Sequence, residues 1–380
     1  MDWSRELKNL VSGGAFSSEK WTASIKFSEL KATPLIVYGL GECSHWFDAI
    51  GMKKYGLRPS VAVDKRPKCN EWVGVPVISS VKLFRDRRHY FNHAVVICVG
   101  DRNLSEQIKN RLCAVGLKKI FHISQFVEFH FPLLTYPIPK FCPDKNTLKK
   151  ISSVLELLED ELSKGIYLRF LQIGLNQMPC LIPCEKNIFQ YFPLDIELNK
   201  GYSNYFCCGS YDGENIRKML FHSKEIEHMS CFEPEPENFK RLEKYAASTN
   251  RKYGSRIHCL QSAVANFTGK FRFTTRGGLG SRLAEDGQLV VEVTRLDDLP
   301  IHDGPTFISM DIEGQELNAL TGGSATLKRY KPDLAICVYH QPTQIWEIPC
   351  FLKNLDLGYK FYLRNYTGFA TETVLYATAG

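Results

Sequence analysis

The feature that most constrains the fold is a regular alternation of β-rich runs and helical patterns in the C-terminal half of the chain. Helical patterns separate the early runs of this half, which begins at about residue 199. The seven β-rich runs lie at 205–208, 229–233, 256–263, 306–310, 334–339, 360–366 and 373–377. Such alternation predicts a mostly parallel sheet flanked by helices. Only 367–372 separates the last two runs, which is too short for a crossover helix and predicts an antiparallel edge hairpin.

A smaller alternation of the same kind lies near the N-terminus. β-rich runs at 35–38, 60–63, 94–99 and 117–123 alternate with helical patterns. Right-handed crossovers between them predict a small parallel sheet over about 31–127. We therefore expect an α/β chain in which a smaller Rossmann-like domain precedes a helical connector and a larger Rossmann-like domain.

A proline-rich passage separates the two alternations. Pro132, Pro137, Pro139 and Pro143 cannot sustain a helix and indicate a linker. After them, 147–162 places six aliphatic side chains at helical spacing, which predicts a helical connector. The expected domains are an N-terminal domain, a linker with connector and a C-terminal domain, at 1–130, 131–198 and 199–380.

The charge is divided unevenly between these parts. The chain carries +7, but residues 1–150 hold 24 basic and 13 acidic residues, whereas the remainder holds 24 and 28. The densest basic run, at 85–88, is short and is accounted for by a solvated face. An anionic acceptor such as a nucleotide-linked or lipid-linked glycan is compatible with the excess, and nothing in the pattern indicates nucleic acid.

The cysteines and the hydropathy pattern bear on the compartment. Thirteen cysteines are scattered without a CxxC pair. Zinc sites and secreted disulfide scaffolds need closely paired cysteines, so we expect free thiols in a reducing cytoplasm. Nowhere do about 18 apolar residues run together, and we therefore expect a cytoplasmic protein without a membrane span.

The first turn of the N-terminal alternation resembles part of a dinucleotide fingerprint. Gly39, Gly41 and Ser44 follow a strand, and Asp64 lies 25 residues after Gly39, but the third glycine is missing. The stretch at 63–79 also resembles small Rossmann-like domains that accompany sugar-modifying transferases. Two alternatives stay open: a nucleotide or sugar-nucleotide site in which Asp64 meets a ribose, and a structural or assembly module in which Asp64 caps a turn.

The first turn of the C-terminal alternation has the composition of a ligand-binding loop. In CCGSYDG at 207–213, Gly209 and Gly213 allow close backbone approach, helix-terminal N–H groups can face a carboxylate, and Asp212 can accept from an ammonium. Glu233 ends the second strand 24 residues after Gly209, close to the spacing at which an acid reaches ribose hydroxyls. The structural alternative is a tight turn in which Asp212 caps a helix.

Two neighbouring strands end in groups suited to proton transfer. The run FISMDIEGQEL delivers Asp311 to the carboxyl end of a buried strand, with Glu313 in the turn and Glu316 at the start of a helix. The next strand ends in His340. We expect Asp311, Glu313 and His340 to face one crevice, whereas Glu316 best fits a capping, solvated acid. A structural histidine is the alternative for His340.

These motifs resemble the FkbM family of S-adenosylmethionine-dependent methyltransferases over about 152–377. The resemblance rests on six blocks in order: YFPLDI at 191–196, CCGSYDGENI, CFEPEPENF, VEVTRLDDL at 291–299, FISMDIEGQE and VYHQPTQIWEIP at 338–349. It implies a Rossmann-like methyltransferase domain that transfers a methyl group from S-adenosyl-L-methionine to an acceptor oxygen, commonly a hydroxyl of a sugar or specialised metabolite, as in polysaccharide biosynthesis.

The resemblance also implies roles for particular residues. The methionine end of the cofactor would be held by the glycine turn, through Gly209, Ser210, Asp212 and Gly213. The ribose would be held by Glu233, and the adenine would lie against Ser262 and Ala263. The family usually has an acidic residue where this chain has Cys207, so one anionic contact is missing.

A sugar hydroxyl is a poor nucleophile while protonated, so a base is expected. Our hypothesis is that His340 or Asp311 accepts the proton while Glu313 orients the acceptor or the histidine, without a metal. The alternative at this site is that the three side chains bind a divalent metal. Two other functions stay open: a nicotinamide-dependent sugar-nucleotide dehydrogenase or epimerase, and a non-catalytic nucleotide-binding scaffold. The expected partner is a small-molecule or glycan acceptor, and the sequence leaves a homo-oligomer open.

Overall fold

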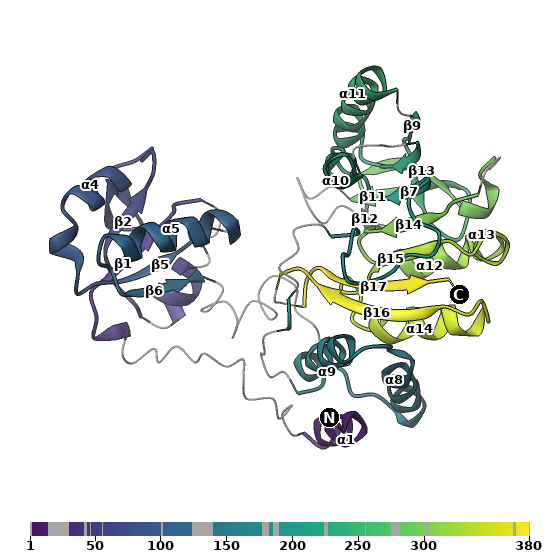
Figure 1. The fold of residues 1–380 in the computed structure, drawn as a ribbon, viewed down its shortest axis with the longest axis horizontal. Helices are drawn as coiled ribbons and strands as arrows, with labels where there is room; N and C mark the ends of the chain where they lie inside the picture. The colour runs from purple at the N-terminus through teal and green to yellow at the C-terminus, as the bar shows by residue number, and fades with distance from the viewer. Residues whose placement is uncertain are drawn as a thin grey trace. The chain divides into compact units, whose positions relative to one another are not determined.

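The structure is a computed structural model that divides into two compact units (Figure 1). It describes residues 2–13, 30–41, 44–45, 47–54, 56–99, 102–123, 140–176, 182–184, 190–223, 227–254, 256–274, 282–300, 304–367 and 370–379. The smaller unit comprises Ser18–Pro137 and Pro179–Leu181, and the larger comprises Met1–Ser17, Ile138–Met178 and Ile182–Gly380. The expected boundaries differ from this division, because the N-terminal segment and most of the connector belong to the larger unit.

The smaller unit is built on a six-stranded sheet in the order β3-β4-β2-β1-β5-β6. Five strands are parallel: β1 (Leu35–Tyr38), β2 (Pro59–Asp64), β4 (Val75–Ser79), β5 (Ala94–Ile97) and β6 (Lys119–His122). The small parallel sheet expected here is therefore confirmed. The sixth strand, β3 (Glu71–Trp72), is antiparallel to β4 and was not predicted, because two residues carry no periodic signal.

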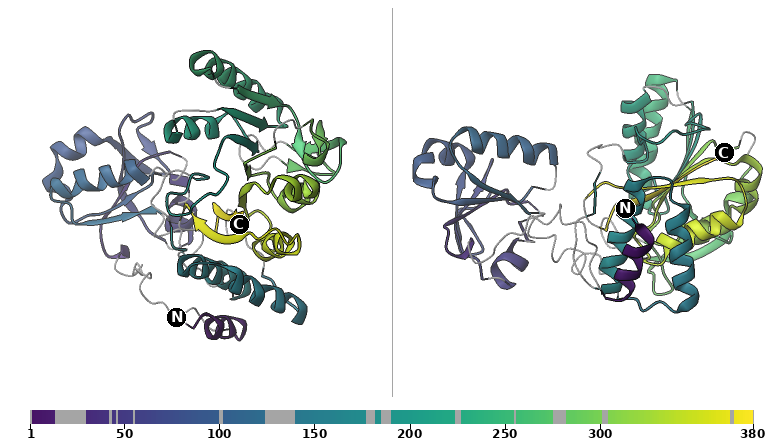
Figure 2. Two further views of the ribbon diagram at one scale, coloured as in Figure 1. Left: turned by 45° about the vertical axis from the view of Figure 1, so that its right-hand side comes forward. Right: turned by 60° about the horizontal axis from the view of Figure 1, so that its bottom comes forward.

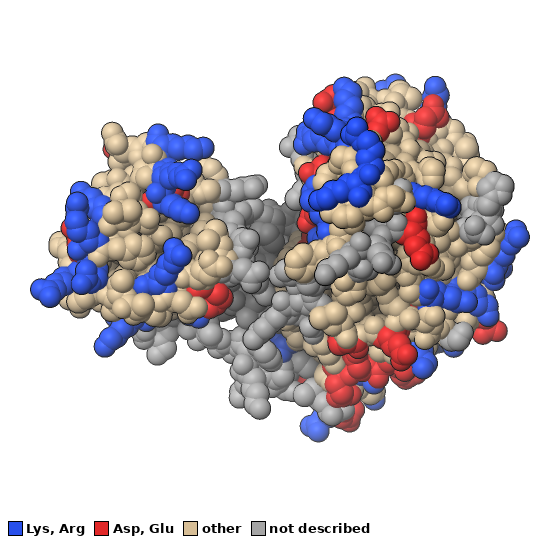
Figure 3. Space-filling view, turned by 45° about the horizontal axis from the view of Figure 1, so that its top comes forward, with Lys and Arg blue, Asp and Glu red and all other residues tan. Residues whose placement is uncertain are grey.

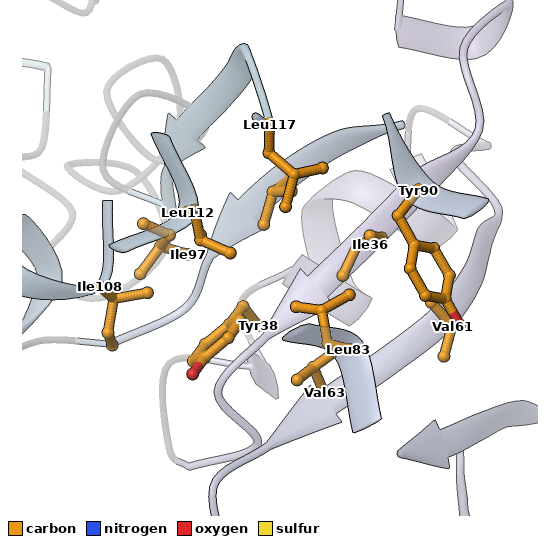
Figure 4. Packing of buried hydrophobic residues seen from close by; sticks show 11 residues of the cluster. Ile36, Tyr38, Val61, Val63, Leu83, Tyr90, Ile97, Ile108, Leu112 and Leu117 are labelled. Carbon is orange, nitrogen blue, oxygen red and sulfur yellow. The ribbon is translucent and has the colours of Figure 1, made fainter. Parts of the chain in front are cut away.

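The core of the smaller unit lies where the sheet meets its helices (Figure 4). The helical elements are a π-helix η2 (Phe47–Lys54), α4 (Ser80–Arg85), a 3-10 turn η3 (Arg87–Tyr90) and α5 (Arg102–Ala114). Apolar side chains of β1, β2 and β5 pack against Leu83 of α4 and Ile108 and Leu112 of α5. Leu104, one turn earlier in the same pattern, is instead 46% exposed.

The glycine turn of the smaller unit is held by Asp64. Gly39 has φ +96°, and a Cβ there would lie 2.9 Å from the carbonyl oxygen of Cys98, so only glycine fits. The Asp64 carboxylate accepts from the N–H of Leu40 at 3.1 Å and from the N–H of Arg66 at 2.8 Å. Asp64 therefore joins the turns after β1 and β2, which is the turn-capping alternative.

The larger unit contains a seven-stranded sheet in the order β16-β17-β15-β14-β7-β8-β9. Five strands are parallel: β7 (Asn204–Cys208), β8 (His228–Phe232), β9 (Arg256–Leu260), β14 (Phe307–Met310) and β15 (Asp333–Cys337). The predicted hairpin is confirmed, since β17 (Thr373–Thr378) is antiparallel to both β15 and β16 (Lys360–Asn365). The chain extends the sheet to one side of β7 and then to the other, so the ends of β7 and β14 flank a topological switch point.

Helices connect these strands (Figure 1). They are α10 (Glu214–Ser223), α11 (Pro236–Tyr253), α12 (Glu316–Thr321), α13 (Ser324–Tyr330) and α14 (Gln344–Asn354), with a 3-10 turn η4 (Leu296–Asp298). Glu235 caps α11 by accepting from the N–H of Asn238 at 2.7 Å, Pro236 fits the first turn and Gly254 ends the helix in the left-handed region. These end signals fix where the chain leaves β8 and returns to β9.

A second, four-stranded sheet follows β9, in the order β10-β13-β11-β12. Its strands are β10 (Ala263–Val264), β11 (Gly269–Thr274), β12 (Arg282–Leu283) and β13 (Leu289–Thr294). The single strand predicted at 256–263 was therefore too long: β9 stops at Leu260, and Ala263 belongs to the other sheet. The small residues expected near an adenine thus lie at the junction of the two sheets.

The connector is two helices rather than one. α8 (Lys145–Leu157) and α9 (Glu161–Asn176) are interrupted at Leu158, whose backbone is extended, and Asp160 accepts from the N–H of Ser163 at 2.7 Å. Pro132, Pro137 and Pro139 of the predicted linker lie outside the described residues.

The N-terminal helix α1 (Trp3–Val11) packs against α8 and α9 (Figures 1 and 2). Trp3 Nε1 donates to Glu161 at 2.8 Å, and Asn176 donates to the carbonyl of Leu10 at 3.1 Å. Leu7 and Leu10 are buried against these helices. The larger unit is therefore assembled from segments on both sides of the smaller one in sequence.

The surface shows the uneven charge expected from the sequence (Figure 3). On this face, basic side chains are spread over the smaller unit with few acidic ones among them, whereas acidic side chains gather on one part of the larger unit. Within the part of the chain that is described, no helix is both long and apolar enough to cross a membrane.

Candidate active site at the switch point

The turn after β7 brings the ends of β7 and β14 into direct backbone contact. Gly209 has φ +86°, and a Cβ there would lie 1.9 Å from the carbonyl oxygen of Asp311. The N–H of Asp311 in turn donates to the carbonyl of Cys208 at 3.0 Å. Gly213, with φ +91°, closes the turn before α10. The glycine requirement at 209 is thus steric as well as conformational.

The backbone N–H groups of this turn are already used within the protein. Those of Gly209 and Ser210 both donate to the carbonyl of Phe232 at 3.0 Å, and that of Gly213 donates to Ser210. Two of these N–H groups thus tie the turn to β8 and the third closes the turn on itself, and the expectation that the turn holds a ligand stays a prediction. Asp212 pairs with Arg217 at 2.6 Å, and it lies two residues before α10, which begins at Glu214.

Glu233 follows β8 and stabilises the turn after β7 by hydrogen bonds. One carboxylate oxygen accepts from the N–H of Tyr211 and the other from the N–H of Glu235, both at 2.9 Å. Glu233 is only 6% exposed, and this burial raises its pKa to about 7. The Asn238 side chain also hydrogen-bonds to this carboxylate, so a ribose hydroxyl would use the acceptor capacity that these three partners leave.

The two predicted adenine-contacting residues lie at the end of β9. Ser262 and Ala263 are each 8% exposed. The Ser262 hydroxyl donates to the carbonyl of Ala263 at 2.9 Å, which ties it to its own backbone. These residues offer a small, mostly apolar surface next to the strand that carries Glu233.

Three acid–base groups meet at the ends of β14 and β15. His340 Nε2 lies 3.3 Å from a carboxylate oxygen of Asp311 and 3.6 Å from one of Glu313. The His340 side chain is 2% exposed, whereas those of Asp311 and Glu313 are 29% and 20% exposed. The structure thus brings Asp311, Glu313 and His340 together and leaves only the two carboxylates in reach of a substrate.

A fourth residue of this cluster, Glu316, was mistaken for a solvated turn acid. It is fully buried, and its Oε1 lies 2.8 Å from His340 Nδ1. The signal that identifies it is helical spacing: in α12 it shares a buried face with Ala319 and Leu320, so it cannot point to solvent. Burial tends to raise the pKa of Glu316, but its contact with His340 holds that pKa below the ordinary value.

The carboxylates determine the charge of His340. Burial alone would lower the pKa of the imidazole, but Glu316 first, and then Asp311 and Glu313, raise it to about 10. An imidazolium has no lone pair with which to accept a proton. Of the two bases proposed from the sequence, the electrostatics therefore favour Asp311 over His340.

Two further residues of the cluster were not singled out from the sequence. The Tyr191 hydroxyl donates to Asp311 Oδ2 at 2.9 Å, opposite the oxygen that faces His340. Glu372, just before β17, accepts from Gln190 at 2.5 Å and from the Tyr339 hydroxyl at 3.2 Å, and burial followed by Asp311 raises its pKa to about 7. No local pattern marks them, because their partners lie far away in the chain.

The metal-binding alternative finds little support in the donor set. The residues that the structure describes contain no group of three or more His, Cys, Asp or Glu side chains placed to hold a metal ion.

Comparison with known proteins finds one matching family model and several solved structures of similar fold. A family model described as "Methyltransferase FkbM domain" matches residues 208–361. None of the curated proteins matches the chain significantly in sequence. Among solved structures, Methyltransferase FkbM from Methylobacillus flagellatus KT is 19% identical with a TM-score of 0.60, and the match covers 99% of each chain. At this identity the likeness shows the shared fold alone.

Two other solved structures match the chain more weakly. An rRNA methylase from Streptococcus thermophilus is 11% identical with a TM-score of 0.28, covering 46% of this chain and 85% of that one. Aeropyrum pernix fibrillarin in complex with S-adenosyl-L-methionine is 13% identical with a TM-score of 0.29, covering 48% and 70%. Scores this low carry no argument about the present chain.

Proposed function

We propose that the chain, whose residues 208–361 match the family model of a methyltransferase FkbM domain, is an S-adenosyl-L-methionine-dependent O-methyltransferase acting on a hydroxyl of a sugar, glycan precursor or specialised metabolite. One observation carries the proposal: a carboxylate with an open side, Asp311, lies directly beside the glycine turn at the switch point of the sheet. Ligands of open α/β sheets bind at this point. A cofactor held by the turn and an acceptor held by the carboxylates would therefore meet there.

The residues around the turn fit the proposed cofactor. Glu233 accepts from Tyr211, Glu235 and Asn238, and its remaining acceptor capacity would serve the ribose hydroxyls. Ser262 and Ala263 would lie against the adenine, and the turn at Gly209 to Gly213 against the methionine end. Asp212 can accept from the ammonium only if it shares its carboxylate with Arg217.

The bound cofactor would supply a methyl group attached to a positively charged sulfur, which is reactive enough to need alignment more than activation. The chain's own residues would prepare the acceptor. Asp311 accepts the proton of the acceptor hydroxyl, and Tyr191 fixes this carboxylate through its other oxygen. Glu313, 20% exposed, is within reach of the same substrate and would orient it. Holding the hydroxyl against Asp311 in this way supplies the orientation that methyl transfer requires.

Two measurements test this proposal on the full chain. Calorimetric titration with S-adenosyl-L-methionine should show binding, and Glu233→Ala should weaken it by at least about tenfold, because a charge-assisted pair of hydrogen bonds is lost. The exposed Glu237, which pairs with Lys240 on α11, gives the control variant Glu237→Ala, whose affinity should be unchanged.

Turnover is followed as release of the demethylated cofactor with a panel of monosaccharide and nucleotide-sugar acceptors. Asp311→Asn should abolish release while binding of S-adenosyl-L-methionine persists. Recovery of a nicotinamide cofactor alone from the purified chain, with no binding of S-adenosyl-L-methionine, would refute the proposed function.

A further inference from the structure

Glu316 is a buried carboxylate that links the two strand ends of the candidate site. Its Oε1 accepts from the N–H of Ile312 at 3.0 Å and from the N–H of Gly314 at 3.3 Å, and it lies 2.8 Å from His340 Nδ1. Through these two N–H groups, Glu316 holds the turn that follows Asp311 and carries Glu313. One atom thus fixes the turn after β14 to the ring at the end of β15.

Both ring nitrogens of His340 face carboxylate oxygens. Nδ1 faces Glu316, while Nε2 lies between Asp311 at 3.3 Å and Glu313 at 3.6 Å. A neutral imidazole carries one proton, so the lone pair of its other nitrogen would point at a carboxylate. A ring protonated on both nitrogens instead donates to Glu316 from Nδ1 and attracts Asp311 and Glu313 electrostatically at Nε2, and a carboxylate as buried as Glu316 needs such a cationic partner.

We propose that Glu316 is a positioning residue that holds His340 as a permanent cation, and that this cation fixes Asp311 and Glu313 for catalysis without itself accepting the substrate proton. The proposal rests on the proposed function and deepens it. It gives a role to the buried Glu316, which does not reach the substrate itself. It also replaces the role of base expected for His340 by the role of a fixed positive charge.

The charge balance around His340 is consistent with this assignment. Asp311 and Glu313 both approach the same ring nitrogen, so without the cation these two carboxylates would have no positive charge between them to offset their repulsion. The neighbouring titratable groups come from every segment packed there: Asp311 and Glu313 after β14, Glu316 in α12, Tyr339 beside the ring, Glu372 before β17, and Tyr191 and Cys337 next to Asp311.

The decisive variant is Glu316→Gln, which keeps the shape and the acceptor oxygen but removes the charge. We expect wild-type methyl transfer to rise with pH and then stay level to about pH 9. In Glu316→Gln, activity should fall as pH rises through the neutral range and should be roughly ten- to hundredfold below wild type at pH 8.5, because His340 then loses its charge. Glu237→Gln, the same change on the exposed face of α11, should follow the wild type.

The opposite role for His340 predicts the opposite result. If His340 were the base, the activity of Glu316→Gln would instead rise as pH rises through the neutral range, because the ring must lose its proton before it can accept one. That outcome, or a Glu316→Gln profile parallel to wild type, overturns the proposal. Titration of each variant with S-adenosyl-L-methionine separates these cases from a failure of the proposed function, in which the wild type itself neither binds nor turns over.

Nitrogen NMR of the wild-type chain labelled at histidine gives a test that does not depend on the variant's folding. One of the ten histidines should keep both ring nitrogens protonated up to about pH 9, and its signal should be absent in His340→Gln. If every histidine is neutral at pH 8, the proposal is wrong.

Discussion

The contact between Gly209 and Asp311 predicts how the site responds to a single methyl group. In Gly209→Ala the new Cβ would lie 1.9 Å from the Asp311 carbonyl oxygen, and real contacts of this kind do not fall below 3.0 Å, so one strand end must move by about 1.1 Å. Because the clashing atom belongs to the backbone, no side-chain rotation relieves it. The variant should separate the ends of β7 and β14.

The expected loss of stability has two parts. A non-glycine residue at φ +86° costs about 1–2 kcal/mol, and forcing an extra carbon into packed surroundings costs about 1–3 kcal/mol more. Gly254→Ala is the matched control, because Gly254 has φ +68° at the end of α11 and a Cβ there meets nothing within 4 Å. The two variants should therefore differ by about 1–3 kcal/mol in free energy of unfolding.

The assay combines urea unfolding with the rate of methyl transfer. A displacement of about 1 Å at Asp311 should lower kcat by about 100-fold in Gly209→Ala, while Gly254→Ala keeps wild-type turnover. If Gly209→Ala is as stable as Gly254→Ala and its kcat lies within about threefold of wild type, the argument that glycine at 209 aligns Asp311 fails.

Two further predictions concern Glu233 and Arg364. The pKa of Glu233 is about 7, and its ionised form is the better hydrogen-bond acceptor, so the affinity for S-adenosyl-L-methionine should fall about tenfold from pH 8 to pH 6. Calorimetry at several pH values measures this slope, and Glu233→Gln should bind weakly and without it. A wild-type affinity that does not change with pH would contradict the reasoning. Arg364 is 2% exposed and pairs with Asp160 and Asp195, so Arg364→Met should cost about 2 kcal/mol of unfolding free energy, less than a fully enclosed pair because both carboxylates reach solvent. Arg251→Met on the exposed end of α11 should change it by under about 0.5 kcal/mol, and equal losses in the two variants would refute the role of the buried pairs.

The elements of the larger sheet were predictable because each strand is a short apolar run bounded by polar turns. Strand ends followed from the same pattern, and with them the meeting of Asp311 and His340 at one edge. The pattern fails where a chain changes sheet without changing composition, as between Leu260 and Ala263. It also fails at 158–160, where three residues that begin with the extended Leu158 divide an otherwise continuous helical pattern.

The pairing of side chains was less predictable than their placement. Glu316 and His340 are 24 residues apart, and their contact depends on which face of α12 meets the sheet. Tyr191 reaches Asp311 across 120 residues, from a segment without regular structure. Periodicity identifies strands and helices, but the partner of a polar side chain is set by tertiary packing.

The position of α1 makes the smaller unit an insertion within the larger one. The chain begins in the larger unit, leaves it after Ser17 and returns at Ile138. Cutting away the first 130 residues would therefore also strip Leu7 and Leu10 from the helices α8 and α9, each burial worth about 1.5–3 kcal/mol. To obtain the larger unit by itself, residues 18–137 should be excised and the flanking ends rejoined, so that the first helix is kept.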